Sequence, residues 1–470
     1  MVTIRHVGVI DIGKTNVKVA VVDLEQRVEI GVLTRPNNVL PGPPYPHYDI
    51  DGHWHFICDA LKELNLAHGI DALSVTAHGA SAVLLDKEGR LASPVIDYEF
   101  TGPDDLETEY DEIRPAFSET GSPRLSMGLN VGAQIHWQLS NDPTLHDRIA
   151  TVLTYPQYWT YRLTGKLANE VTSLGCHTDL WCPQQASYSS LIGKLDLGAR
   201  MAPVKKAADL MGPLLPDVAQ EIGIPADLKV TCGIHDSNAS LYPYLQERRP
   251  PFSVVSTGTW VITLAIGGVD VTLDPSRDTL MNVNAHGDPV PSARFMGGRE
   301  FDLVMSGREA SCAARDVEHV LTEPILLFPA VDPRSGPFQG KTHSWNTDET
   351  NLSDGERYAA VSFYLALMTA ECLKITGALG PSLVEGPFAR NSLYLDMLAA
   401  ATERSVETSS GSSTGTSTGA ALLLDKKVTA QAFGSDFTDK AETFDGRLTG
   451  YASEWKSAVQ SQLNRSIPQR

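Results

Sequence analysis

Two carboxylates, each placed where a strand pattern ends, are the residues of this chain best suited to phosphate chemistry. Asp11 closes a β-branched apolar run. The turn that follows consists of Gly13, Lys14, Thr15 and Asn16. Backbone N–H groups and hydroxyls of such a turn can hold phosphate oxygens, and Lys14 adds positive charge. Asp11 would face the same phosphates only with a cation such as Mg²⁺ between them. The alternative is an ordinary hairpin with a solvated tip.

The second carboxylate is Asp236, in the segment Cys232–Ser240, where a strand pattern passes into a helix start. A carboxylate there could accept the proton of an attacking hydroxyl during phosphoryl transfer. Aspartate is also a frequent helix N-cap, and the two roles are compatible. A second hairpin pattern, Phe252–Leu264, follows directly, and its turn offers donors from Thr257, Gly258 and Thr259. From these residues alone, a general base and a helix cap both stay open for Asp236.

Similar hairpins in the two halves of the chain predict two similar α/β domains. A chain of 470 residues is too long for one core. We expect domains at 1–245 and 246–450, followed by a tail at 451–470.

The elements that must position these residues follow from hydrophobic periodicity. The expected strands are Val2–Asp11, Val17–Asp23 and Asp71–Gly79. The expected helices are Leu125–Ser140, Gln157–Leu163 and Ala359–Leu379. The Ser/Thr/Gly-rich stretch Ser409–Gly419 could be a flexible linker, but we favour a turn before a small-residue helix at Gly419–Leu424, because apolar residues resume at once.

Bulk composition narrows the classes of partner. The formal net charge of −19 argues against a general binder of nucleic acids or anionic membranes. The six cysteines form no C-x-x-C pair, which leaves reduced cytosolic thiols as the default. No signal-peptide pattern and no run of 18 apolar residues occur, so we expect a cytoplasmic protein without a membrane span.

Four of these segments, taken in chain order, resemble the motifs of the FGGY carbohydrate kinases in the actin/Hsp70/sugar-kinase superfamily. They are the Asp11–Lys18 hairpin, the base segment at Asp236, the Ser256–Trp260 turn and the segment Gly386–Asn391. The residues His235-Asp236-Ser237 are most similar to the corresponding motif of the rhamnulose and fuculose kinase branch. The resemblance covers nearly the whole chain. It implies two ribonuclease-H-like α/β domains around a central cleft, with ATP and Mg²⁺ as cofactors.

The resemblance also implies a role for each matching residue. Asp236 would be the catalytic base and Asp11 the residue that holds hydrated Mg²⁺. The implied ATP-binding residues are Gly13, Lys14, Thr15, Asn16, Thr257, Gly258, Thr259, Gly386 and Asn391. The implied sugar-binding residues are His78, Ser81, Tyr98, Trp137, His235 and Asp236. Packed histidines and aromatic side chains of the core are the competing interpretation for His78 and Trp137.

The sequence departs from the family pattern in three places. Ser81 stands where many relatives carry an acidic residue. Glu385-Gly386-Pro387 stands where a run of glycines is usual, and the segment Ile96–Phe100 lacks an arginine that relatives carry. We expect phosphorylation of a small ketose or deoxyketose, such as L-rhamnulose, L-fuculose or a pentulose, with a homodimer as one allowed assembly. An actin- or Hsp70-like ATPase acting through a protein partner and a sugar-responsive binding protein with little turnover are the alternatives.

Overall fold

The computed structural model describes residues 4–408, 415–425 and 445–465. The chain forms two compact units. Unit 1 contains residues 1–248, 281–289 and 413–434, and unit 2 contains residues 249–280, 290–412 and 435–470. Each unit is described by itself. The domain limits expected from the sequence stay predictions, because these units are defined by spatial proximity alone.

The central sheet of unit 1 begins with an antiparallel meander of β1 (His6–Ile12), β2 (Asn16–Asp23) and β3 (Val28–Pro36). Next to β1 the parallel strand β6 (Ala72–Ala77) continues the sheet. The sheet order is β3-β2-β1-β6-β14-β13, with β15 also paired to β6. The outer strands are β13 (Leu210–Gly212), β14 (Lys229–Thr231) and β15 (Ile234–His235). The parallel β1–β6–β15 register brings the ends of β1, β6 and β15 to one edge of the sheet.

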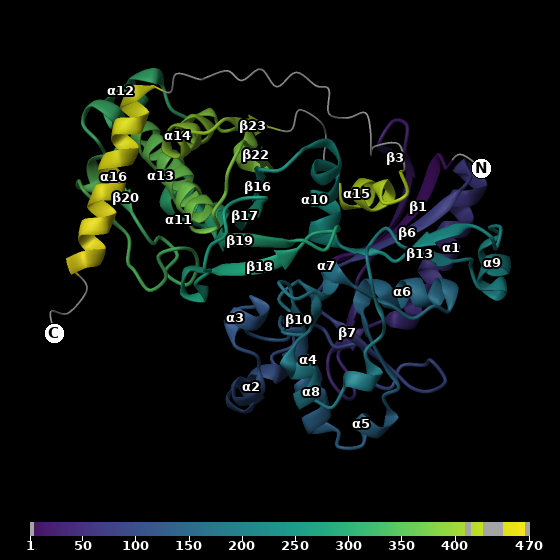
Figure 1. Ribbon diagram of the computed structural model, residues 1–470. Coiled ribbons are helices and arrows are strands. Elements are labelled where there is room, and N and C mark those ends of the chain that lie inside the picture. Colours follow the sequence, from purple (N-terminus) through teal and green to yellow (C-terminus); the bar gives the residue numbers. More distant parts are fainter. Residues whose placement is uncertain (1–3, 409–414, 426–444, 466–470) are drawn as a thin grey trace. The chain divides into compact units, whose positions relative to one another are not determined.

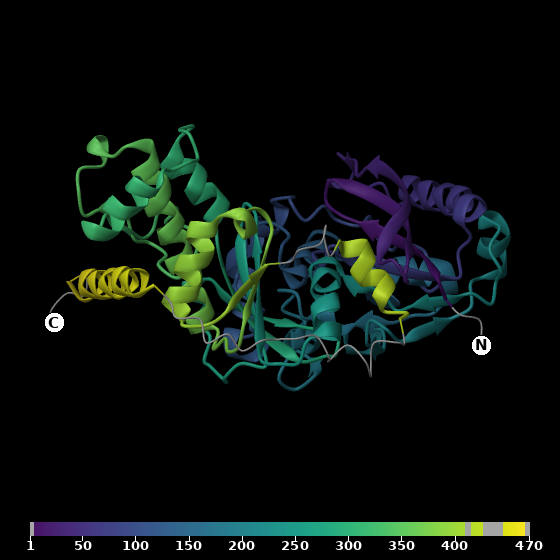
Figure 2. The same cartoon turned by 90° about the horizontal axis from the view of Figure 1, so that it is seen from above.

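Helices cover both faces of this sheet. Helices α1 (Ile50–His68) and α6 (Tyr155–Thr164) pack side by side, with the guanidinium of Arg162 over the Trp54 ring at 4.3 Å. Helices α10 (Asp236–Glu247) and α15 (Thr416–Leu422) pack together against β1 and β6. Figure 2 shows α15 and α1 on opposite sides of the first strands. The core between these layers is built from the valine and isoleucine residues of β1 and β2, which are fully buried.

The remaining elements of unit 1 are short. The hairpin of β4 (Val39–Leu40) and β5 (His47–Tyr48) carries the proline-rich segment, and α9 (Pro216–Ile222) packs on α1. A second apolar cluster lies between the β7–β8 pair and the helices around α4. Its elements and their neighbours are β7 (Ala82–Leu85), α2 (Glu107–Ile113), α3 (Phe117–Thr120), α4 (Val131–Asn141), α5 (Leu145–Arg148), β8 (Thr151–Thr154), β9 (Asn169–Glu170), α7 (Val171–Leu174), β10 (Trp181–Cys182), β11 (Ser187–Tyr188), α8 (Ser190–Lys194) and β12 (Val204–Lys205).

The sheet of unit 2 repeats the same strand pattern. Strands β16 (Phe252–Thr257), β17 (Val261–Ile266) and β19 (Pro289–Phe295) are antiparallel neighbours, and β22 (Ser382–Glu385) and β23 (Val406–Thr408) continue in parallel from β16. The full order is β18-β19-β17-β16-β22-β23, with β18 at Thr279–Val283. An antiparallel meander followed by parallel strands beside its first member is thus common to both units, which confirms two ribonuclease-H-like α/β units (Figure 1).

Helix α13 (Asp354–Ile375) is the central helix of unit 2 and packs against β17 and α14 (Ser392–Thr402). Among the described residues it is the single helix whose length and composition would suit a membrane span, yet 78% of its most apolar window is buried inside the protein. The expected amphipathic helix at Ala359–Leu379 is therefore a helix buried on nearly every side. The other elements are α11 (Gly297–Met305), α12 (Ala314–Thr322), β20 (Leu327–Phe328), β21 (Ser344–Trp345) and α16 (Gly446–Arg465).

The sequence predicted the hairpin strands closely, whereas helix starts were less well placed. The helix expected from Leu125 begins at Val131, because residues 123–130 form a loop held by Asn130, whose side chain bonds the backbone of Pro123 and Leu125. The predicted small-residue helix near Gly419 is confirmed as α15. Residues 409–414 of the Ser/Thr/Gly-rich stretch lie outside the described residues.

Candidate active site

Hydrogen bonds within the first predicted phosphate turn, between β1 and β2, and from Asn37 outside it hold the turn in place. Inside the turn, the Gly13 N–H donates to the Asn16 carbonyl at 2.9 Å. From the end of β3, Asn37 donates through its side chain to the Gly13 carbonyl and through its backbone to the Thr15 carbonyl, each at 2.8 Å. The amide oxygen of Asn37 in turn contacts Nε2 of the buried His53 at 2.8 Å. The turn is thus fixed in shape before any ligand arrives.

Asp11 lies on β1 directly before this turn and shares its carboxylate with a lysine. Lys18 Nζ is 3.2 Å from Asp11 Oδ2, and Lys18 also pairs with Glu29 at 3.0 Å. The Ser417 hydroxyl of α15 donates to the same Asp11 oxygen at 3.3 Å. Burial raises the pKa of Asp11, Lys18 opposes that rise, and the charge of Asp236 adds to it. Asp11 and Asp236 are therefore close enough to repel each other, which a bound cation would relieve.

Asp236 occupies the predicted strand-to-helix turn, as the first residue of α10 after β15. Its carboxylate accepts the Ser237 N–H at 2.6 Å and lies 3.1 Å from Nε2 of His235. Burial raises the pKa of Asp236 to about 6 and lowers that of His235 to about 4. At neutral pH the pair is therefore a carboxylate beside a neutral imidazole. A carboxyl with a raised pKa is a better proton acceptor than an ordinary surface aspartate.

His78 follows β6 and sits in a cage of tyrosine rings. Its ring centroid is 4.8 Å from that of Tyr155, 5.0 Å from that of Tyr98 and 5.3 Å from that of Tyr48. Within the described residues, neither buried ring nitrogen of His78 has a hydrogen-bond partner. Burial lowers the pKa of His78 to about 3, so the imidazole is neutral. Unpartnered buried polar atoms are costly, and a ligand hydroxyl would satisfy these.

Lys14 of the first turn faces carboxylates in the 97–99 segment. Its ammonium bonds Asp97 and lies 3.0 Å from Glu99, and it sits 4.9 Å from the centre of the Tyr98 ring. Asp97 also accepts a hydrogen bond from the Tyr48 hydroxyl at 3.2 Å. The predicted contact of Lys14 with a γ-phosphate stays a prediction, and it requires the ammonium to leave this pair of carboxylates.

Two predicted sugar-binding residues lie beside this cluster. Ser81 is buried and its hydroxyl bonds the Ile96 carbonyl at 3.4 Å, so it anchors the segment that carries Tyr98. Trp137 on α4 packs edge-on against Phe100 and Tyr45, with ring centroids 5.1 and 5.4 Å apart. Both residues support the walls of the cluster, and their contact with a sugar stays a prediction.

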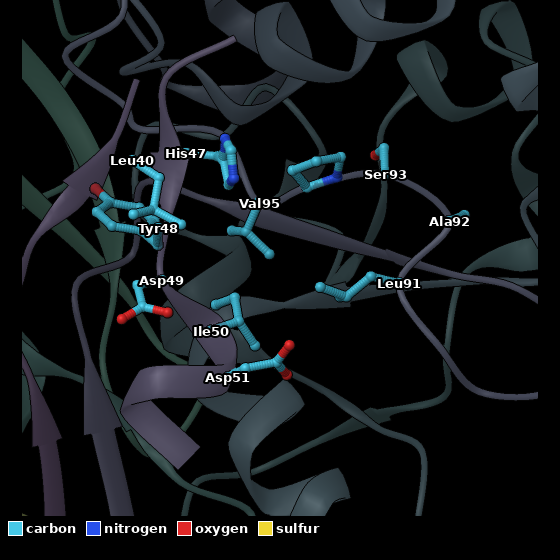
Figure 3. Close-up of a pocket in the computed structure, with 11 residues that line it drawn as sticks. Leu40, His47, Tyr48, Asp49, Ile50, Asp51, Leu91, Ala92, Ser93 and Val95 are labelled. Atoms are coloured by element: carbon cyan, nitrogen blue, oxygen red, sulfur yellow. The ribbon is translucent and has the colours of Figure 1, made fainter. Parts of the chain in front are cut away.

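A pocket of about 280 Å³ lies beside Tyr48, and Figure 3 shows the residues that line it. Val95, Ile50 and Leu91 line it between His47 at one end and Asp51 at the other. None of the predicted site residues lines this pocket.

In unit 2 the second predicted phosphate turn is joined to the loop after β22. The Gly258 N–H donates to the Trp260 carbonyl at 2.9 Å. The Thr257 hydroxyl donates to the Glu385 carbonyl and accepts the Phe388 N–H at 3.1 Å. Gly386 has φ +84°, and a Cβ there would lie 1.9 Å from the Thr257 carbonyl oxygen. Thr257 and Gly386, predicted separately as ATP-binding residues, are therefore neighbours.

Two further predicted ATP-binding residues of unit 2 are Thr259 and Asn391. Thr259 stands in the turn itself, and its Cα lies 3.1 Å from where a Cβ on Gly298 would be. Asn391 caps α14 by accepting the Tyr394 N–H at 3.2 Å, and its amide donates to Ser362 at 2.9 Å. The helix-capping role of Asn391 is thus observed, and its role toward a nucleotide stays a prediction.

Helix α11 lies beside the second predicted phosphate turn. It begins at Gly297, and a Cβ on Gly298 would lie 2.3 Å from the Gly258 carbonyl oxygen. Only glycine allows this approach, which places the N-terminus of a nine-residue helix against the second phosphate turn. Free N–H groups at a helix start favour anions, so the position of α11 suits the predicted phosphate role of the turn. The sequence leaves Gly297–Glu300 open between a cleft loop and a helix N-terminus, and the structure shows the helix start.

We expect Gly298→Ala to separate α11 from the turn, with a loss of about 1–3 kcal/mol in the free energy of unfolding of unit 2. Chemical denaturation measures this loss. Gly450→Ala in α16 is the matched control, because nothing lies within 4 Å of the added Cβ. A helical glycine-to-alanine change should raise stability slightly. Equal stability of the Gly298→Ala variant and the wild type would show that the contact between Gly298 and the Gly258 carbonyl has room for a methyl group.

No group of three or more His, Cys, Asp or Glu side chains among the described residues could hold a metal ion. Mg²⁺ in phosphate chemistry usually keeps several waters and binds one or two carboxylates plus the phosphates. The mutual repulsion of Asp11 and Asp236 fits that arrangement, with Asp11 as the protein ligand.

Comparison with known proteins bears on this geometry. Residues 6–242 match the model described as FGGY family of carbohydrate kinases, N-terminal domain, and residues 249–432 match Carbohydrate kinase FGGY, C-terminal domain. A crystal structure of a carbohydrate kinase from Novosphingobium aromaticivorans is similar, with a TM-score of 0.86 and 33% identity over 96% of this chain and 100% of that one.

Curated relatives match over a shorter stretch. An L-fuculokinase of Salmonella typhi is 25% identical over 273 residues, which are 56% of this chain and 57% of the relative. A probable L-xylulose kinase of Haemophilus influenzae is 24% identical over 48% of this chain and 49% of its own length. The chain thus spans about half the length of the curated relatives it matches.

Proposed function

Because the chain belongs to the FGGY family of carbohydrate kinases, we propose that it transfers the γ-phosphoryl group of ATP to a hydroxyl of a small ketose or deoxyketose. The observation that carries the proposal is the arrangement around Asp236. A carboxylate with a raised pKa stands at a strand-to-helix turn, beside a neutral His235 and close to Asp11. An ATPase acting through a protein partner has no need of a base for a sugar hydroxyl. The curated fuculokinases and probable xylulose kinases support a ketose as the substrate class.

The sugar is assigned to the cluster around His78. Its two unpartnered ring nitrogens offer one donor and one acceptor to hydroxyl groups. Tyr98 and Tyr155 supply apolar ring surface, which suits the C–H face of a sugar and the methyl group of a deoxysugar. Asp97 and Glu99 offer acceptors that Lys14 occupies in this structure.

Asp236 then accepts the proton of the attacking hydroxyl as the new P–O bond forms. His235 Nε2 and the Ser237 N–H both contact Oδ1 of this carboxylate. Each predicted phosphate turn would bind phosphate oxygens through its own backbone N–H groups, with Thr15 in unit 1 and Thr259 in unit 2. Asp11 would hold hydrated Mg²⁺, which neutralises phosphate charge when bound.

The proposal is tested by a panel of sugars with detection of ADP. The panel includes L-fuculose, L-rhamnulose, L-xylulose and other pentuloses, each with ATP and Mg²⁺. We expect ADP release that depends on one or a few ketoses. An ATPase rate that no sugar changes would instead support the partner-driven ATPase. Saturable sugar binding without ADP release would support a binding protein.

The pH dependence of kcat/KM follows from the raised pKa of Asp236. The base must be ionised, so we expect kcat/KM to fall about tenfold per pH unit below about pH 6. The groups facing the carboxylate are His235, Asp11 and Tyr98, and burial keeps His235 neutral above about pH 4. An acid limb near pH 4 in a profile measured with saturating Mg²⁺ would contradict this assignment.

A further inference from the structure

Glu170 is a fully buried carboxylate that is linked through Thr172 to His235, the neighbour of the predicted base. It has no part in the proposed phosphoryl transfer. It stands at the end of β9, directly before the four-residue helix α7. Its side chain accepts four hydrogen bonds, from the backbone N–H and the hydroxyl of both Thr172 and Ser173, at 2.6–3.2 Å. All three residues have no exposed surface.

Helix capping explains only part of this arrangement. The two backbone N–H groups are those that an N-terminal cap satisfies. The two hydroxyl donors are additional, and the Thr172 hydroxyl has a second partner. Its oxygen accepts the backbone N–H of His235 at 3.1 Å. Because the hydroxyl proton is directed to Glu170 at 2.6 Å, a lone pair is left facing His235.

The result is a chain of hydrogen bonds that begins at the backbone of His235, the residue before Asp236 in the sequence. It runs from the His235 N–H to the Thr172 oxygen and from the Thr172 hydroxyl to Glu170. The imidazole of His235 is held separately, by the Asn238 amide at 3.3 Å from Nδ1. With Nδ1 accepting from that amide, Nε2 carries the proton and can donate to Asp236 Oδ1 at 3.1 Å.

We propose that Thr172 and Glu170 are positioning residues, which fix the backbone of His235 and thereby the carboxylate of Asp236 for proton acceptance. This inference rests on the proposed kinase function and deepens it. Neither residue touches the reacting atoms. A small displacement of a catalytic group lowers turnover without weakening substrate binding, and 1 Å can cost about 100-fold.

The test compares Thr172→Val with Thr172→Ser. Valine has nearly the shape of threonine but no hydroxyl, whereas serine keeps it. We expect Thr172→Val to lower kcat about 10- to 100-fold with KM for sugar and ATP within threefold of wild type. We expect Thr172→Ser to stay within threefold of wild type in kcat. Wild-type turnover in Thr172→Val would overturn the proposal.

A double-variant experiment distinguishes a specific effect on the position of Asp236 from a general loss of structure. In an Asp236→Asn background the base is already gone, so Thr172→Val should lower the residual rate no further. An equal loss in both backgrounds would overturn the proposal, because Thr172 would then act on something other than Asp236.

Hydrogen exchange tests the contact without any turnover. The amide of His235, followed in peptides covering 234–238, should exchange faster in Thr172→Val than in the wild type and stay protected in Thr172→Ser. Equal exchange in all three proteins would refute the link. If wild-type protein releases no ADP with any sugar, the proposed function fails first, and faster exchange in Thr172→Val still supports the contact while removing its catalytic role.

Discussion

Replacing Asp236 by asparagine should lower sugar-dependent turnover by a factor on the order of 10²–10⁴, the usual contribution of a general base. Asparagine keeps the shape and the acceptor oxygen, so the Ser237 N–H retains a partner. What is lost is a group that can take a proton. ATP binding should change little, because no predicted phosphate contact involves Asp236.

Steady-state ADP release and equilibrium ATP binding measure the two effects. Asp147→Asn is the matched control, since the Asp147 side chain is 94% exposed and is none of the predicted site residues. Near-normal turnover in a folded Asp236→Asn variant would remove this residue from the mechanism.

The same substitution should stabilise the protein at alkaline pH. The pKa of Asp236 is about 6 in the folded protein, above the 3.8 of an ordinary aspartate. Ionised Asp236 therefore favours the unfolded chain above pH 6, and the wild type regains that stability as the pH falls from 6 towards 4. We expect the variant to have the higher Tm at pH 8 and the difference to shrink below pH 6. A constant difference across this range would show that Asp236 is not strongly desolvated.

Replacing Asp11 by asparagine should weaken Mg²⁺-dependent transfer, with a 10- to 100-fold loss in apparent Mg²⁺ affinity, the range found for groups that hold a metal through its outer ligands. The substitution removes the charge and keeps the hairpin. It also leaves Lys18 paired with Glu29 at 3.0 Å. Titration of Mg²⁺ against rate at fixed ATP measures the effect.

Glu29→Gln is the matched control for the Asp11 variant. Glu29 pairs with the same Lys18 ammonium at 3.0 Å, so this change disturbs the lysine without removing the predicted metal ligand. We expect its Mg²⁺ dependence to match that of the wild type. An unchanged Mg²⁺ titration in Asp11→Asn would mean that Asp11 is a turn residue that pairs with Lys18.

The hairpins were predictable because everything that specifies them is local. β-branched runs and the Gly/Thr turns near Gly13 and Gly258 encode strand, turn and strand within about 15 residues. The cage around His78 was not predictable in this way. Tyr48, Tyr98 and Tyr155 come from three distant segments, and only the tertiary fold brings them together.

The ion-pair partners of Lys14 were also not predictable from local sequence. The sequence suggested Lys14 as a phosphate ligand because it stands in a turn, but its partners Asp97 and Glu99 lie more than eighty residues away. Glu170 has neither a motif nor a periodic pattern to mark it. Its importance is visible only in its burial and in the hydroxyl that connects it to His235.

Helix α15 has a consequence for how the protein is made. Residues 420–424 belong to the same apolar core as β1 and β2, although they are translated some four hundred residues later. On the ribosome, the first strands of unit 1 therefore emerge long before the helix that covers one of their faces. Unit 1 cannot complete its core until residues 420–424 have left the ribosome, and its exposed valines need protection from aggregation until then. A fragment that ends at residue 248 lacks this helix and leaves part of its core open to water.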